Sequence, residues 1–172
     1  MNQITDKISK KFITLLINWT TMQFRKGTKK DFNALREIWR EFYYWECERD
    51  PELKKDYAIK GIPTQLSKDL RNKDVSFFIA KDTGVIGFAR ATIEDSPAYL
   101  KHDRTGHITN LYVKENFRGK GIGKSLLKEC FKFFEKRKIT NSKIMVNSYN
   151  KKAEKLYKRL GFREQIKTLT KP

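Results

Sequence analysis

The chain has 172 residues and a net charge of +18, with 38 lysines and arginines against 20 aspartates and glutamates. This length suits one domain with a sizeable core. The basic excess favours anionic partners, such as a nucleotide, nucleic acid, the ribosome or an acidic protein, over polycations such as spermine. No run approaches the about 20 apolar residues of a membrane span, so no membrane partner is expected.

The two cysteines, Cys47 and Cys130, lie far apart in the sequence. They form neither a disulfide framework nor the spacing of a metal site, and the chain has no cluster of cysteine and histidine. This pattern predicts that the protein binds no metal and works in a reducing, cytoplasmic compartment.

Residues 1–21 are expected to be an extension that precedes the domain, which we place at residues 22–172. Three lysines precede the apolar stretch 12–17, an order similar to that of a secretory signal, but no small-residue cleavage site follows. One alternative is that Met22 is the biological start of the chain. Another is that the apolar residues of the extension cover a surface or mediate homodimerisation.

The first half of the domain predicts a strand followed by two helices. Thr28 and Asp31 form a plausible capping pair for the first helix, and apolar residues then recur at helical spacing. Gly61 and Pro63 interrupt a polar stretch and predict a loop. The elements expected here, in chain order, are a strand over 22–26, a helix over about 32–50, a loop over 51–63 and a short helix over 64–71.

The second half predicts strands that alternate with helices. The elements expected here are strands over 75–80, 85–93, 107–113, 143–148 and 162–169, and helices over 121–137 and 150–160. Turn residues at 82–84 join the first two strands into a hairpin, and Gly161 stands where a C-cap glycine belongs. The resulting order, β-α-α-β-β-β-α-β-α-β, is typical of an α/β domain.

A glycine-rich loop joins the strand over 107–113 to the helix over 121–137, with the sequence NFRGKGIGKSLL at residues 116–127. Glycines let backbone N–H groups turn toward one point, and a helix N-terminus adds partial positive charge, so this loop predicts a phosphate site. Arg118, Lys120 and Lys124 would strengthen it. The loop is one residue too short for a Walker motif, and it lacks the third glycine of a dinucleotide fingerprint.

Two motifs make the chain resemble the GCN5-related N-acetyltransferases (GNAT). Residues 118–123 fit R-x-x-G-x-G, the coenzyme A pyrophosphate loop of that family, and residues 146–162 fit V-x-x-x-N-x-x-A-x-x-L-Y-x-x-L-G-F. The resemblance covers roughly residue 22 to the C-terminus. It implies the α/β GNAT fold, with a mixed, mostly antiparallel sheet flanked by helices, and acetyl-CoA as cosubstrate.

The resemblance also implies which residues bind the cofactor. The fourth strand would pair with the pantetheine arm, and the glycine loop would hold the pyrophosphate on its backbone N–H groups. Asn150 would contact the pantetheine and also cap the last helix. In this fold a bulge splays the fourth strand from the fifth, a feature that we cannot see in the sequence. The expected cofactor-binding residues are Leu111, Tyr112, Val113, Arg118, Gly119, Lys120, Gly121, Gly123, Lys124, Ser125, Asn150 and Tyr157.

Tyr157 is the expected general acid, because it matches the tyrosine of the family's second motif. A phenol with its ordinary pKa near 10 is protonated at neutral pH and can give its proton to the leaving thiolate. The alternative is a tyrosine that only packs with Leu156 and Leu160.

The expected general base departs from the common pattern of the family. Many relatives carry glutamate on the fourth strand, whereas this strand reads HITNLYV and has no carboxylate. His107, expected on the same face as Thr109 and Leu111, is the candidate, since histidine ordinarily titrates near neutral pH. A solvated histidine at the strand end is the alternative, and the base would then be Glu94, Asp95 or a water chain.

The expected reaction is direct attack on the thioester by a primary amine of a protein, a peptide or a small molecule. We expect the acceptor pocket along the end of the first helix, where aromatic and charged residues gather. They are Tyr43, Tyr44, Trp45, Glu46, Glu48, Arg49 and Asp50. The alternative function is a catalytically weak module of the same fold that binds CoA or uses its basic surface. A nucleic-acid partner rests on charge alone.

Overall fold

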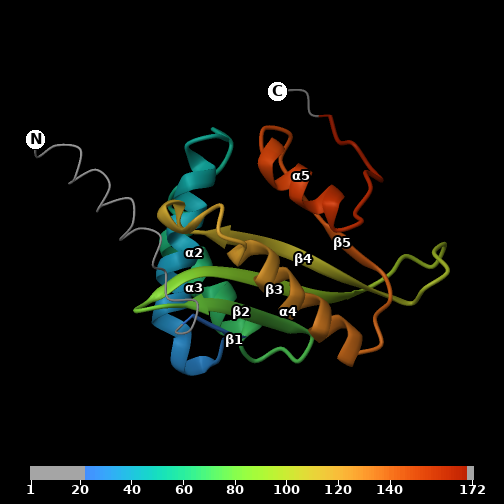
Figure 1. Ribbon diagram of the computed structural model, residues 1–172, viewed down its shortest axis with the longest axis horizontal. Helices are drawn as coiled ribbons and strands as arrows, with labels where there is room; N and C mark the ends of the chain where they lie inside the picture. The colour runs from blue at the N-terminus through green and yellow to red at the C-terminus, as the bar shows by residue number, and fades with distance from the viewer. Residues whose placement is uncertain (1–21, 170–172) are drawn as a thin grey trace, which may run out of the picture.

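The computed structural model describes residues 22–169, so the extension expected over residues 1–21 lies outside the described part. Figure 1 shows the strands side by side with helices packed on them. The strands are β1 (Gln23–Lys26), β2 (Val75–Lys81), β3 (Val85–Asp95), β4 (Arg104–Val113) and β5 (Ser142–Ile144). The helices are α2 (Phe32–Cys47), α3 (Tyr57–Asp69), α4 (Ile122–Lys136) and α5 (Lys151–Arg159), with short 3-10 turns η1 (Lys29–Asp31) and η2 (Glu115–Phe117).

The strands form one five-stranded sheet in the order β1-β2-β3-β4-β5. Neighbouring strands are antiparallel from β1 to β4, whereas β4 and β5 are parallel. A parallel pair needs a crossover connection, which α4 supplies here. The expected mixed, mostly antiparallel sheet is therefore confirmed.

Two helical layers cover opposite faces of the sheet. Ala89 and Ala91 of β3 pack in the cluster that contains Leu126 and Leu127 of α4. Phe88, the residue before Ala89, packs instead in the cluster formed with α2 and α3. This alternation follows from the period of two along a strand, and it gives the α2–α3 layer and the α4 layer separate cores (Figure 1).

The structure corrects the predicted start of α3. The helix begins at Tyr57, so the second half of the loop expected over 51–63 is helical, and Gly61 and Pro63 lie within it. Its buried residues are Ala58, Ile62, Leu66 and Asp69. Burial of this face against α2 and the sheet outweighs the helix-propensity penalties, which are about 1 kcal/mol for glycine and about 3 kcal/mol for proline relative to alanine.

The structure also corrects the end of the chain. β5 is shorter than the strand expected over 143–148, and residues 162–169 form no strand. Ile166 and Leu169 are 81% and 84% exposed, so their apolar side chains gain no burial that would favour pairing.

Two further observations concern the helices and the cysteines. None of the helices within residues 22–169 has the length and apolar character that crossing a membrane requires. Cys47 and Cys130 are both unbonded and buried. Burial raises the pKa of the Cys130 thiol, so this side chain behaves as an inert apolar group.

Candidate functional site

β4 carries a bulge at Thr109. Asn110 and Ile108 pair with two successive residues of β3, so Thr109 between them has no partner there. Among the described residues, β5 pairs with β4 through residues 106–108 and no further. Beyond Thr109, β4 therefore continues to Val113 without β5 beside it, and we call this region the β4–β5 split. The family resemblance implied such a bulge, which the sequence did not reveal.

The bulge decides which residues of β4 face the layer of α2 and α3. His107 lies opposite Thr92 on that face. Thr109 and Asn110 lie on the same face as His107, because the two residues of a bulge place their side chains on one side of the sheet. Leu111 instead packs in the core on the α4 side. We expected His107, Thr109 and Leu111 on one face, and this is wrong for Leu111, since the extra residue shifts the alternation by one.

The loop between β4 and α4 presents a row of backbone N–H groups. Gly119 and Gly121 have φ angles of 78° and 76°, in the left-handed region that favours glycine. In the described part of the chain, no backbone N–H of residues 119–124 donates to a backbone acceptor, whereas that of Ser125 donates to the Gly121 carbonyl oxygen at 3.0 Å. These free donors lie at the N-terminus of α4, so the loop can bind phosphate.

Arg118 fastens this loop to β4 and α2. Its Nε donates to the Val113 carbonyl oxygen at 2.8 Å. The guanidinium lies 5.3 Å from the ring centre of Trp45 and 5.5 Å from that of Tyr112. The backbone N–H of Arg118 donates to the Glu115 carbonyl oxygen at 3.0 Å. The row of free backbone donors therefore begins at Gly119, while the charge of Arg118 stays beside the split.

The remaining expected loop residues surround these donors. Lys120 Nζ donates to the Asn116 carbonyl oxygen at 3.3 Å, which holds its charge against the loop. Lys124 is exposed in the first turn of α4. A Cβ on Gly123 would lie 3.9 Å from both Leu111 and Leu156, so at this residue α4 meets β4 and α5. The two signature motifs thus contact each other directly in the folded chain.

Tyr157 and Asn150 lie on α5. The Asn150 Oδ1 accepts from the Ala153 backbone N–H at 3.2 Å, which confirms the expected N-cap. Tyr157 is 7% exposed and packs edge-on against Phe162 at 6.2 Å between ring centres. Burial raises the pKa of Tyr157 to about 12. Its phenol is therefore fully protonated at neutral pH.

His107 is hydrogen-bonded to Glu94, so the two candidate bases form one unit. His107 Nδ1 lies 2.9 Å from Glu94 Oε1, and Lys143 Nζ lies 2.9 Å from Glu94 Oε2. Burial acts to raise the pKa of Glu94, but hydrogen bonds from Lys143, His107 and Thr92 outweigh it and lower the pKa to about 2. Glu94 is therefore an ionised acceptor at neutral pH and a very weak base.

This pairing settles the tautomer of His107. Because the Glu94 carboxylate can only accept, Nδ1 of neutral His107 carries the proton and Nε2 keeps its lone pair. His107 Nε2 is buried and has no hydrogen-bond partner among the residues of the described part. A lone pair of this kind can accept a proton from a group that enters the site.

Residues at the C-terminal end of α2 contact segments on both sides of the β4–β5 split. Trp45 lies beside Arg118 of the loop and, at 6.4 Å between ring centres, beside Tyr149 after β5. Glu46 accepts from Asn147 Nδ2 at 2.9 Å, and burial raises the pKa of its carboxyl. Trp45 and Glu46 are thus the residues of the expected acceptor pocket that contact segments flanking the split.

Sequence reasoning missed Asp69 and Arg90, which meet at the bulge. Arg90 Nη1 donates to the Thr109 hydroxyl at 2.8 Å, and Arg90 Nε donates to Asp69 Oδ2 at 2.8 Å. The available signal was a single charged residue inside the otherwise apolar alternation of the strand over 85–93. Charged residues are rarely buried without a specific partner.

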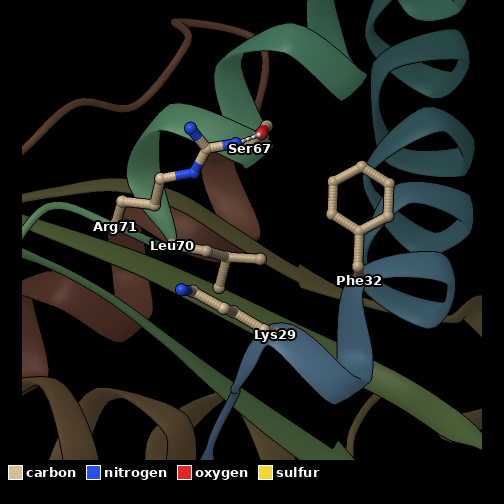
Figure 2. A pocket seen from close by; sticks show the side chains of 5 residues that line it. All are labelled: Lys29, Phe32, Ser67, Leu70 and Arg71. Atoms are coloured by element: carbon tan, nitrogen blue, oxygen red, sulfur yellow. Dashed lines mark hydrogen bonds between the residues drawn. The ribbon is translucent and has the colours of Figure 1, made fainter.

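A separate groove of about 280 Å³ lies between the start of α2 and the end of α3, lined by Lys29, Phe32, Ser67, Leu70 and Arg71. Figure 2 shows Phe32 extending from α2 on one side and the Arg71 guanidinium donating to the Ser67 hydroxyl, at 2.8 Å, on the other. None of the expected site residues lines this groove. Within residues 22–169, no group of three or more histidine, cysteine or acidic side chains is placed to hold a metal ion.

Comparison with known proteins points to one family. The family model described as "Acetyltransferase (GNAT) family" matches residues 32–162. Spermidine N(1)-acetyltransferase from Thermoplasma acidophilum is 26% identical over 151 residues, which cover 83% of this chain and 89% of the relative. N-alpha-acetyltransferase from Sulfurisphaera tokodaii is 33% identical over 103 residues, which cover 55% of this chain and 60% of the relative.

Solved structures share the fold. The structure of AAC(6')-Iy in complex with a CoA-containing bisubstrate analog has a TM-score of 0.71 and 20% identity, covering 88% of this chain and 97% of that one. A predicted acetyltransferase from Clostridium acetobutylicum, solved with acetyl-CoA, has a TM-score of 0.72 and 25% identity, covering 88% and 96%. The expected fold class is confirmed by these likenesses.

Proposed function

The chain belongs to the acetyltransferase (GNAT) family and is an acetyl-CoA-dependent N-acetyltransferase, and we propose that its acceptor is a primary amine of a protein, a peptide or a small molecule. The observation that supports the site most strongly is the row of free backbone N–H groups at residues 119–124 beside the β4–β5 split. Such donors at a helix N-terminus suit a pyrophosphate.

The proposed reaction forms one bond and breaks one. The amine nitrogen attacks the thioester carbonyl, and the carbonyl oxygen gains negative charge. β4 beyond Thr109 has no β5 partner among the described residues, so backbone N–H groups on that edge are available to stabilise the oxyanion. The carbon–sulfur bond then breaks, and the phenol of Tyr157 protonates the departing thiolate. The proton that the base took from the amine then returns to the Tyr157 phenolate through water, which restores the resting protein. Tyr157 is 7% exposed and, with a pKa of about 12, holds its proton at neutral pH, so the proton is present on the ring when the thiolate forms.

We assign the general base to His107 and the orienting role to Glu94. Glu94 holds the Nδ1 proton, so the lone pair on Nε2 is the one available to the acceptor amine, directly or through a water. Because Nε2 has no hydrogen-bond partner within residues 22–169, an acceptor amine or a water that reaches it would be its first. The carboxylate also stabilises the imidazolium that forms after proton transfer.

His107→Ala is expected to lower turnover by ~10²–10⁴-fold, the usual effect of losing a general base. Wild-type turnover should rise with pH as the base loses its proton, and the variant should lose that rise. The measurement is a pH–rate profile. His102→Ala is the matched control, since His102 contacts Thr105 rather than Glu94, and it should keep the wild-type profile. An unchanged profile in His107→Ala would move the base role to a carboxylate or to water.

The acceptor class is suggested by the end of α2. Glu46, a half-buried carboxylate held by the neutral amide of Asn147, lies next to the aromatic pair Trp45 and Tyr149. A half-buried carboxylate beside the Tyr149 ring suits an ammonium group, whereas the Trp45 ring already carries the Arg49 guanidinium 4.0 Å from its centre. The net charge of +18 opposes this local attraction, because it repels long polycations. The relative named for spermidine and the relative named for N-alpha acetylation therefore define the two acceptor types to compare.

The proposal is tested with acetyl-CoA and a panel that contains spermidine, a peptide with a free N-terminus and a peptide whose only amine is a lysine. Free thiol release that depends on one of these amines, matched by an acetylated product, is the expected result. CoA binding without amine-dependent thiol release would instead favour the alternative of a module that binds CoA without turnover. The cytoplasmic location stays a prediction from the two unpaired cysteines.

A further inference from the structure

The bulge at Thr109 is held by a buried ion pair on the face covered by α2 and α3. Arg90 donates to Asp69 through two nitrogens, with Nε at 2.8 Å from Oδ2 and Nη2 at 3.1 Å from Oδ1. The Asp69 side chain is 4% exposed and the Arg90 side chain 14%. Gln65 Nε2 adds a third hydrogen bond to Asp69 at 2.8 Å. Hydrogen bonds to Asp69 of α3 therefore fix the orientation of the Arg90 guanidinium.

The third nitrogen of the Arg90 guanidinium, Nη1, reaches the bulge. Arg90 Nη1 donates to the Thr109 hydroxyl oxygen at 2.8 Å. The same hydroxyl lies 3.3 Å from the Arg90 carbonyl oxygen and 3.1 Å from Asn110 Oδ1, either of which can take its proton. The Thr109 hydroxyl thus accepts one hydrogen bond from Arg90 and donates its only proton within this cluster. No proton of this hydroxyl is left for catalysis.

Stability alone gives no reason for an ion pair here. The surrounding cluster is apolar and contains Trp39, Leu66 and Phe88, and replacing a buried ion pair by apolar residues of similar volume is often neutral or stabilising. An apolar pair would hold α3 against β3 equally well. It could not donate to the Thr109 hydroxyl, which is the contact that joins this pair to β4.

We propose that Asp69 and Arg90 are positioning residues that hold Thr109 in the bulge and so keep the β4–β5 split open for the pantetheine arm of acetyl-CoA. This inference rests on the proposed function of the split. Thr109 is where β4 leaves β5, so the position of its backbone determines where the free edge of β4 begins. Without the contact to Arg90, Thr109 can leave the bulge, and β4 can change its register against β3.

Thr109→Val removes the hydroxyl while it keeps the shape of the side chain. We expect CoA affinity, measured by calorimetry, to fall about 10-fold, which equals about 1.4 kcal/mol and lies close to the usual contribution of a hydrogen bond to a charged group. The KM for acetyl-CoA should rise by a similar factor, with turnover at saturation nearly unchanged. Thr109→Ser keeps the hydroxyl and should bind CoA nearly as the wild type does.

Thr105→Val is the matched control for stability. It also deletes a buried hydroxyl from β4, one that contacts Ser96 and His102 upstream of the bulge. It should lower the melting temperature as Thr109→Val does and leave CoA affinity unchanged. Should Thr109→Val not fold, Arg90→Lys serves instead, because lysine keeps the charge but lacks the fork that reaches Asp69 and Thr109 together.

The outcomes separate this inference from the proposed function. Wild-type CoA affinity in Thr109→Val, or an equal loss in Thr105→Val, would overturn the positioning role and leave the acetyltransferase site standing. Failure of the wild-type protein to bind CoA would overturn the proposed site itself. Weaker CoA binding in Thr109→Val, with recovery in Thr109→Ser, supports the role of Asp69 and Arg90.

Discussion

Replacing Tyr157 with phenylalanine is expected to lower turnover by ~10²–10⁴-fold, the usual effect of removing a general acid. The substitution deletes one hydroxyl from a ring that is 7% exposed and keeps its packing against Phe162. Steady-state rates of thiol release give the effect on turnover. Calorimetry with CoA should show nearly unchanged affinity, because the phosphate donors that we propose belong to residues 119–124.

The pH dependence of the wild type gives a second check on Tyr157. Burial raises the pKa of this phenol to about 12, so the acid form persists throughout the neutral and moderately alkaline range. Turnover should therefore show no loss from tyrosine ionisation below that value. Tyr57→Phe, which removes a hydroxyl from the 40% exposed ring on α3, is the control and should keep full turnover. Full turnover in Tyr157→Phe would exclude the acid role.

Gly121→Val is expected to weaken CoA binding about 10-fold or more. Gly121 has a φ of 76° at the N-terminus of α4, and a residue with a Cβ pays roughly 1–2 kcal/mol to adopt this left-handed conformation. Without CoA, the substituted loop can relax to an unstrained conformation, and it must return to the strained one to bind pyrophosphate. A strain energy of about 1.4 kcal/mol lowers the affinity for CoA tenfold. Calorimetry with CoA measures the change.

Gly161→Ala controls for strain without touching the phosphate loop. Gly161 has a φ of 90° after α5, and a Cβ there would meet no atom within 4 Å. The melting temperature of the Gly161→Ala variant should fall by an amount comparable to that of Gly121→Val, while the CoA affinity of Gly161→Ala should stay at the wild-type value. Equal CoA affinity in the wild type and Gly121→Val would remove the glycine loop from the binding site.

Local patterns predicted the parts of the fold that local physics determines. The apolar spacing placed α4 correctly, because one face of that helix is buried along its length. The run of glycines predicted the turn of the 119–121 loop for a similar reason, since the positive φ angles at Gly119 and Gly121 are a property of single residues. The Asn150 cap was predictable from its position just before an amphipathic run.

Long-range contacts decide the parts that the sequence could not predict. The bulge at Thr109 depends on Arg90, 19 residues away in the chain, and Glu94 selects the tautomer of His107 from 13 residues away. The start of α3 was missed because Gly61 and Pro63 suggest a loop, whereas burial of Ile62 and Leu66 favours a helix. Pairing, register and burial act between segments, so residue spacing alone does not reveal them.

The central claim is that the 119–124 loop and the β4–β5 split form one cofactor site, and an NMR titration of the ¹⁵N-labelled protein with CoA tests it most directly. We predict that the amide signals of Gly119, Gly121 and Lys124 shift together with those of residues 109–113, and that all of them saturate at the same CoA concentration. Shifts confined to other parts of the chain, with both groups unmoved, would contradict the account.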